Sequence, residues 1–153
     1  MGAGHQALRR GRWSEAGRIY LVTFTTARRQ PHFIDWPVAS DAARLMANSS
    51  AWHESRLLAW VLMSDHWHGL VELGDGVLLA DCTRRVKGAS ARSLRQRHPI
   101  PGRVWATGYH DHALRKQGDL LAAARYLVMN PVRARLVSRV GDYPFWDAVW
   151  ISP

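Results

Sequence analysis

Two histidines separated by a single tryptophan are the residues of this chain whose types and spacing most directly suggest chemistry. His66 and His68 flank Trp67 within the largely apolar stretch 57–73. Residues two apart on a β-strand point to the same face, so both imidazoles would project together and Trp67 would point the opposite way. The spacing therefore predicts two ligands of a metal site. The alternative is a pair without metal, in which one histidine lies at a sheet edge and the other is half-buried and hydrogen-bonded, because two imidazoles do not complete a coordination sphere.

A tyrosine and an asparagine four residues apart form the second candidate group. Tyr126 and Asn130 lie on one side of a predicted helix, away from its apolar residues, so their side chains would face the same pocket. An amide oxygen can join two imidazoles around Mg²⁺ or Mn²⁺ and leave positions open for a phosphodiester. Tyr126 would then be the nucleophile, with Arg125 and Arg133 favouring the phenolate and the charge that develops at phosphorus. The resulting phosphotyrosine could later be resolved by a hydroxyl without ATP.

Each of these two residues also has an ordinary structural explanation. Tyr126 fits the surface of an amphipathic helix, and Asn130 fits the N-cap of a following helix that has Pro131 at its first position. The case for catalysis therefore comes from their combination with the histidine pair.

The charge balance indicates a polyanionic partner. Twenty-one lysines and arginines against twelve aspartates and glutamates give a formal net charge of +9, and all of the basic residues except Lys87 and Lys116 are arginine. Guanidinium groups bind phosphate in a bidentate manner and stack on bases, which favours nucleic acid over a membrane surface. We predict DNA contacts from clustered basic residues, namely Arg84, Arg85, Lys87, Arg92, Arg115, Arg125 and Arg133.

Length and composition limit the class of protein further. The 153 residues suit one compact domain, and no stretch approaches the length of a membrane span. The first residues lack the apolar core of a secretory signal, and the single cysteine, Cys82, excludes an internal disulfide. We expect one cytoplasmic domain over residues 1–153, without a membrane partner. It would have a basic leader at about 1–17 and an aromatic tail at about 141–153 that packs back on the body.

The apolar pattern predicts an α+β fold in which a sheet positions these groups. Ser64 and Asp65 would join the two strands of a β-hairpin, with the histidines at the start of the second strand. The predicted elements are a strand at 18–26, a loop at 28–37, a helix at 38–55, the hairpin strands at 57–63 and 66–73, a helix at 77–97, a strand or extended segment at 104–114, a helix at 119–128 and a short helix at 132–140. This order predicts an antiparallel β-sheet with helices packed on one face and the other face open to a ligand.

Four sequence blocks, in order along the chain, resemble one known family. The single-tyrosine HUH transposases have two histidines that flank a bulky hydrophobic residue, and the branch that the blocks resemble is the REP-associated tyrosine transposases (RAYT). The last block is the most specific, because few other proteins have a tyrosine four residues before the asparagine of an Asn-Pro-Val-Arg-Ala run. The blocks are 20–25 (YLVTFT), 60–72 (WVLMSDHWHGLVE), 109–115 (YHDHALR) and 126–137 (YLVMNPVRARLV).

The resemblance implies a ferredoxin-like or RRM-like HUH nuclease domain and assigns a role to each candidate residue. His66, His68 and Asn130 become ligands of Mg²⁺ or Mn²⁺, and Tyr126 becomes the nucleophile. The implied activity is metal-dependent cleavage and transfer of single-stranded DNA next to a palindromic hairpin, through a 5′-phosphotyrosine and a free 3′-hydroxyl. The active unit would be a monomer or a homodimer. Two rival interpretations are a non-catalytic domain that binds single-stranded or hairpin nucleic acid and a phosphodiesterase in which the metal activates water.

The chain departs from the family pattern next to the histidines. Ser64-Asp65 stands where Pro-Asn is expected, and Gly69 stands where a larger apolar residue is usual. The ligands remain, but Asp65 adds negative charge near the metal. The third block contains Asp111 and His112, which we expect either to support the metal ligands or to contact DNA; the alternative is a hydrogen-bond network at the end of a strand.

Overall fold

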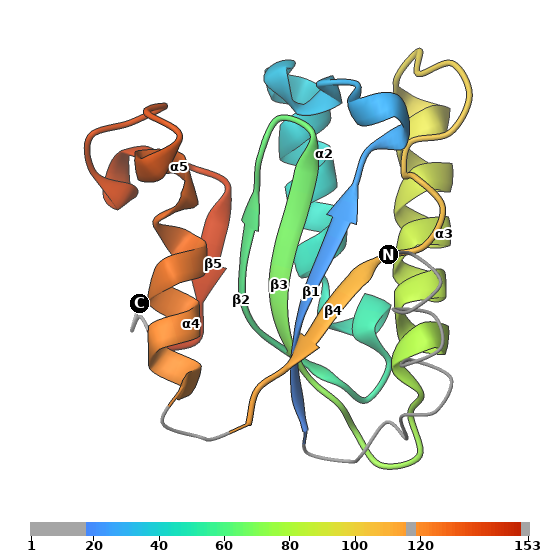
Figure 1. The fold of residues 1–153 in the computed structure, drawn as a ribbon. Helices are drawn as coiled ribbons and strands as arrows, with labels where there is room; N and C mark the ends of the chain where they lie inside the picture. The colour runs from blue at the N-terminus through green and yellow to red at the C-terminus, as the bar shows by residue number, and fades with distance from the viewer. Residues whose placement is uncertain (1–17, 116–118, 151–153) are drawn as a thin grey trace.

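The protein is described here by a computed structural model of residues 18–115 and 119–150, with a five-stranded antiparallel sheet at its centre (Figure 1). The spatial order of the strands is β4-β1-β3-β2-β5, so the strand that begins with the histidines is the central one. The strands are β1 (Ile19–Thr25), β2 (Arg56–Leu62), β3 (His66–Glu72), β4 (His110–Ala113) and β5 (Trp146–Ala148). The expected leader at 1–17 lies outside the described residues. Of the aromatic tail predicted at about 141–153, β5 pairs with β2, and residues 151–153 lie outside the described residues.

The larger core lies on the face of the sheet that we call the α3 face. Two helices cover it, α2 (Trp36–Ala47) and α3 (Leu79–Arg97). Alternation along β1 buries Tyr20, Val22 and Phe24 beneath these helices. Buried residues recur at four-residue intervals in α3, where Cys82, Val86, Ser90 and Leu94 face the sheet.

The opposite face, which we call the α4 face, carries one helix. α4 (Asp119–Val128) buries Ala124 and Leu127 against β2 and β3, and in Figure 1 it stands on the other side of the sheet from α3. On β1, Leu21 and Thr23 of this face remain only half-buried. The predicted α+β fold with an antiparallel sheet is confirmed, with one refinement. A helix packs on the face that we expected to be open, because its apolar residues need a surface to cover them.

The predicted helix at 38–55 has different ends in the structure. α2 begins two residues earlier because the Asp35 carboxylate accepts a hydrogen bond from the backbone N–H of Val38 at 3.4 Å and Pro37 occupies the first turn. It ends well before residue 55 because Asn48 is extended and its side chain accepts the backbone N–H of Ser50 at 3.0 Å, which starts a separate 3-10 turn, η3 (Ser49–Trp52).

Two further predictions of extent are changed by the structure. Of the strand or extended segment predicted at 104–114, only β4 is a regular strand, and Trp105 makes a single bridge to Thr26. The helix predicted at 132–140 is replaced by α5 (Asn130–Arg133) and a 3-10 turn, η4 (Val140–Asp142). Two other 3-10 turns, η1 (Ala27–Arg29) and η2 (His32–Ile34), follow β1. Among the described helices, none has the length and apolar character needed to cross a membrane.

Candidate active site and metal centre

The histidine pair lies on the α4 face at the start of β3. Strand alternation places His66 and His68 on this face together with Leu70, and it places Trp67 in the core of the α3 face. The two imidazole rings are neighbours, with centroids 4.6 Å apart and ring planes at 73°. The fold therefore brings the two predicted metal ligands together and points both of them out of the main core.

Thr23 of β1 orients His68. The strand register pairs the two residues, and Thr23 Oγ1 lies 2.7 Å from His68 Nδ1. This hydrogen bond fixes the ring and leaves Nε2 as the atom available to a metal. Burial lowers the pKa of His68 to about 4, and the positive charges of His66, Arg133 and Arg29 add to the effect. His68 is therefore neutral near pH 7, which is the form that ligates metal ions.

Asp65 orients His66 in a similar way. Asp65 Oδ1 lies 2.8 Å from His66 Nδ1, and Oδ2 accepts a hydrogen bond from Arg29 Nε at 3.0 Å. Burial alone would raise the pKa of Asp65, but the hydrogen bonds from His66 and Arg29 hold it below its ordinary value. A carboxylate behind a ligating histidine favours the tautomer that carries its proton on Nδ1 and presents Nε2 to a metal.

These contacts fit a pair of metal ligands. Each Nδ1 is held, whereas neither Nε2 has a hydrogen-bond partner among the described residues. The described part of the chain contains no group of three His, Cys, Asp or Glu side chains that would form a metal site. A third ligand from this part of the chain would therefore be of another type, and the amide oxygen of an asparagine is one that Mg²⁺ and Mn²⁺ accept.

Tyr126 projects into solvent from α4 and contacts a cation. Its side chain is 66% exposed, and the guanidinium carbon of Arg133 lies 3.8 Å from the centroid of its ring. The same guanidinium contributes to the lowered pKa of His68. Arg133 therefore contacts the candidate nucleophile and acts on the histidine pair through its charge. This connection is the main structural link between the two groups of candidate residues.

Asn130 does not share one continuous helix with Tyr126. α4 ends at Val128, and Asn130 begins α5 immediately before Pro131, which has no N–H to continue the helical hydrogen bonds. The two residues therefore lie on successive helices, α4 and α5, which are separated only by Met129, whose backbone stays in the α region. The N-cap alternative is wrong, because Met129 occupies that position. The Asn130 side chain makes no hydrogen bond to the described residues, so its amide oxygen is free to act as a ligand.

The residues of β4 point to different faces of the sheet. His112 pairs with Leu21 of β1 and lies, exposed, on the α4 face, whereas Asp111 pairs with Val22 and lies on the α3 face. Asp111 therefore cannot support the histidine pair directly. β1 separates His112 from β3, so His112 does not lie beside the histidine pair.

The residues predicted to contact DNA also divide between the two sides of the sheet. Lys87 on α3 is half-buried and donates hydrogen bonds to the carbonyls of Ala106 at 2.7 Å and Gly108, so it also holds a loop in place. Burial lowers the pKa of Lys87, and the charge of Arg103 adds to this shift. The α3 group is Arg84, Arg85, Lys87 and Arg92, and the second group is Arg115 after β4, Arg125 on α4 and Arg133 on α5.

Comparison with known proteins identifies the family. The family model described as "Transposase IS200 like" matches residues 16–129, which is most of the chain and includes the histidine pair and Tyr126. The chain belongs to the IS200-like transposase family. A search of curated proteins found no match to this transposase.

Two solved structures share the fold of this transposase. One is a REP-associated tyrosine transposase bound to a REP hairpin, with a TM-score of 0.69 and 19% identity over 88% of this chain and 79% of that chain. The other is a candidate transposase from Deinococcus radiodurans R1, with a TM-score of 0.58 and 22% identity over 78% of this chain and 95% of that chain. Both confirm the fold predicted from the sequence blocks.

Two residues that support the site of this transposase were not found by sequence analysis. Only its position opposite His68 in the neighbouring strand identifies Thr23 as a supporting residue. The sequence of β1 alone does not determine which residue of β3 lies opposite it. Arg29 lies in a segment predicted as a loop. It has a left-handed backbone with φ of 54°, and its contact with Asp65 joins two loops far apart in sequence. An unusual aspartate next to the histidines was the one sequence signal that pointed to this contact.

Proposed function

We propose that this transposase is a metal-dependent endonuclease and strand transferase that cuts single-stranded DNA next to a palindromic hairpin. The observation that carries the proposal is the histidine pair, whose two Nδ1 atoms are held by Thr23 and Asp65 on the sheet face that also carries Tyr126. Family membership supports a DNA-processing enzyme. The relative that was solved with a REP hairpin supports such a hairpin as the substrate type.

His66, His68 and Asn130 would hold Mg²⁺ or Mn²⁺. When bound, the ion would polarise the scissile phosphate and stabilise the negative charge that develops on it. Thr23 and Asp65 act before the reaction, because their hydrogen bonds keep both imidazoles in the orientation that presents Nε2. Neutral His68 needs no deprotonation near pH 7 before it binds the ion.

Tyr126 would carry the covalent step. Its phenolate oxygen attacks phosphorus, the bond from phosphorus to the 3′ oxygen breaks, and that oxygen takes up a proton and leaves as a 3′-hydroxyl. The phosphate stays on the 5′ end as a phosphotyrosine, and attack by another 3′-hydroxyl reverses the step and joins two strands. Arg133, in contact with the Tyr126 ring, would stabilise the negative charge that develops at phosphorus.

The test is a covalent-adduct assay with Mn²⁺ and hairpin oligonucleotides designed from short inverted repeats sought in the DNA that flanks the gene. A label on the 3′ side of the cut is expected to migrate with the protein on a denaturing gel. A label on the 5′ side is expected in a shortened free strand that a polymerase can extend. Tyr126→Phe and His66→Ala are expected to lose the adduct. The control Tyr143→Phe, which removes a hydroxyl that donates to the Leu62 carbonyl, is expected to keep it.

Two results would contradict the proposal in different ways. Cutting that persists in Tyr126→Phe, with products free of protein, would indicate a phosphodiesterase in which the metal activates water. Tight hairpin binding by the wild type without cutting of any flanking palindrome would indicate a binding domain.

A further inference from the structure

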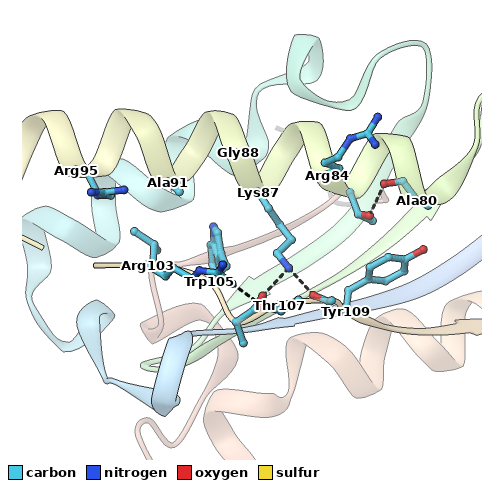
Figure 2. Close-up of a pocket in the computed structure, with 14 residues that line it drawn as sticks. Ala80, Arg84, Lys87, Gly88, Ala91, Arg95, Arg103, Trp105, Thr107 and Tyr109 are labelled. Atoms are coloured by element: carbon cyan, nitrogen blue, oxygen red, sulfur yellow. Dashed lines mark hydrogen bonds between the residues drawn. The ribbon is translucent and has the colours of Figure 1, made fainter. Parts of the chain in front are cut away.

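A pocket on the α3 side of the molecule lies outside the site described above. It has a volume of about 620 Å³ and lies between α3 and the segment 103–109 (Figure 2). Small residues of α3, among them Gly88 and Ala91, leave room at the helix surface, and Trp105 and Tyr109 supply aromatic lining. The volume falls within the roughly 300–1,000 Å³ that is usual for small-ligand sites.

The segment that closes this pocket is firmly held. Lys87 reaches across from α3 and donates hydrogen bonds to the carbonyls of Ala106 and Gly108, as Figure 2 shows. Trp105 donates from Nε1 to Ser90 Oγ at 2.9 Å, and the N–H of Ala106 donates to the carbonyl of Thr25 at 2.8 Å. The pocket is therefore part of the packed fold and does not depend on loosely held loops.

The charged side chains that line the pocket are all positive. They are Arg84, Lys87, Arg95 and Arg103, and the lining contains no aspartate or glutamate. Arg84 pairs with Asp81 on the helix surface at 3.0 Å. Arg95 and Arg103 have no acidic partner among the described residues. An anionic ligand would therefore meet two guanidinium groups whose charges are not neutralised.

A second hollow extends the pocket along α3. It has a volume of about 560 Å³, shares Gly88, Ala91 and Arg95 with the first, and adds Arg92. Together the two hollows form what we call the α3 groove. α3 has 19 residues, so it is about 28 Å long. A free phosphate or nucleotide would occupy only part of such a groove, whereas a nucleic-acid strand would follow it.

We propose that the α3 groove binds an unpaired segment of the substrate DNA away from the cleavage site. One unstacked base would enter the larger pocket beside Tyr109 and the edge of Trp105, with flanking phosphates on Arg95 and Arg103. Aromatic lining and arginines together are the features that bind single strands with little sequence preference. The inference rests on the proposed action on hairpin DNA and adds a recognition site on the opposite side of the sheet from His68.

Gly88 offers a variant that fills the pocket without strain. It lines both hollows, and a Cβ built at this position would meet no atom within 4 Å. Replacing a glycine within a helix also favours the helix. Gly88→Leu is therefore expected to fold and to occupy the pocket. Gly88→Ala is the matched control, because it changes the backbone preference in the same direction and adds little volume.

The experiment compares two fluorescein-labelled hairpins by anisotropy, one with a single-stranded thymidine tail and one with an abasic tail of the same length. Wild type and Gly88→Ala are expected to bind the thymidine tail about tenfold more tightly, the effect of one stacked base. Gly88→Leu, with its fold checked by circular dichroism, is expected to bind both tails equally. At saturating DNA it is expected to form the Tyr126 adduct as wild type does, because the pocket and Tyr126 lie on opposite faces.

Two results would overturn the α3 groove as a DNA site. One is a folded Gly88→Leu protein that discriminates the two tails as wild type does, and the other is equal binding of both tails by wild type. Neither result affects adduct formation by wild type. Loss of that adduct would instead refute the proposed function, so the two failures can be distinguished.

Discussion

Replacing Asp65 tests the support of the proposed metal site without changing the residues proposed to bind the metal. Asp65→Ala removes the acceptor that lies 2.8 Å from His66 Nδ1 and also the ion pair with Arg29 at 3.0 Å. Asp65→Asn keeps an acceptor oxygen at nearly the same place but removes its charge. We expect the affinity for Mn²⁺ to decrease from wild type to Asp65→Asn and further to Asp65→Ala.

The size of the effect follows from these contacts. Loss of the partner behind a ligating histidine lowers metal affinity by about 10–100-fold, or about 1.4–2.7 kcal/mol. A hydrogen bond to a neutral acceptor is about half as strong as one to a charged acceptor, so Asp65→Asn should lose about half of that free energy. The Arg29 side chain is 59% exposed, so its ion pair contributes about 1 kcal/mol or less to folding. The loss of metal binding should therefore exceed the loss of stability.

The assay is titration of the purified protein with Mn²⁺ in the absence of DNA, read by calorimetry or by the electron paramagnetic resonance of the free ion. Neither the nucleophile nor DNA binding enters this measurement. Asp75→Ala is the matched control, because Asp75 is an exposed carboxylate in the turn beyond the other end of β3. A folded Asp65→Ala protein that binds Mn²⁺ as tightly as wild type would refute the reasoning. If Asp75→Ala weakened Mn²⁺ binding equally, the effect of Asp65→Ala would be due to the loss of one negative charge anywhere on the protein.

Four further predictions test the core, the groove, the metal and an ion pair. Gly69→Ala is expected to destabilise the fold by about 1–3 kcal/mol, because a Cβ there would lie 2.7 Å from Cζ2 of the buried Trp67. The measurement is urea unfolding, and an unchanged free energy of unfolding would contradict this packing. Arg95→Gln is expected to lower the slope of log Kd against log salt for single-stranded DNA by about 0.7, the value for one phosphate contact. A chelator is expected to abolish the adduct and leave the melting temperature of the DNA-free protein nearly unchanged, because the histidine pair lies outside the main core; unfolding by the chelator would show a structural metal. The hydrogen bond from His98, with nearby positive charges, holds the pKa of Asp41 in the folded protein below its ordinary value of 3.8. The Asp41 carboxylate therefore stabilises the fold above that pH, and this stabilisation is lost as the pH falls through the pKa of Asp41 in the folded protein. Asp41→Asn should therefore lessen the loss of thermal stability below about pH 4, and an unchanged acid profile would contradict the assignment.

The elements that sequence analysis placed correctly are those whose signals are local. Burial alternates along the whole of β1 and over the first four residues of β3, and the pair His66 and His68 needs only one strand to bring its rings together. Pro131 shows the limit of such signals. The sequence analysis took Pro131 as the first residue of the next helix. It therefore did not predict that α4 ends at Val128, between Tyr126 and Asn130.

The features that could not be predicted depend on contacts between distant segments. Thr23 supports His68 only because of the register of β1 against β3. The segment around Trp105 has strand-like composition, yet it is held mainly by Lys87 and by the end of β1, and so it closes a pocket instead of extending the sheet. The basic residues of α3 were predicted to contact DNA, but the groove beside them needs the small residue Gly88, which no charge pattern marks.

The end of β1 supports both the histidine pair and the α3 groove. The N–H of Thr26 donates to the carbonyl of Asp65 at 2.9 Å, which fixes the turn that orients His66. The neighbouring N–H of Ala27 donates to the carbonyl of Val104 at 2.9 Å, which fixes the segment that closes the groove. The two sites open on opposite faces of the sheet and yet share one short, buried support. Under the proposed function, this support would keep DNA bound in the groove at a constant distance from the cleaving residues, as cutting at a set distance from a hairpin requires.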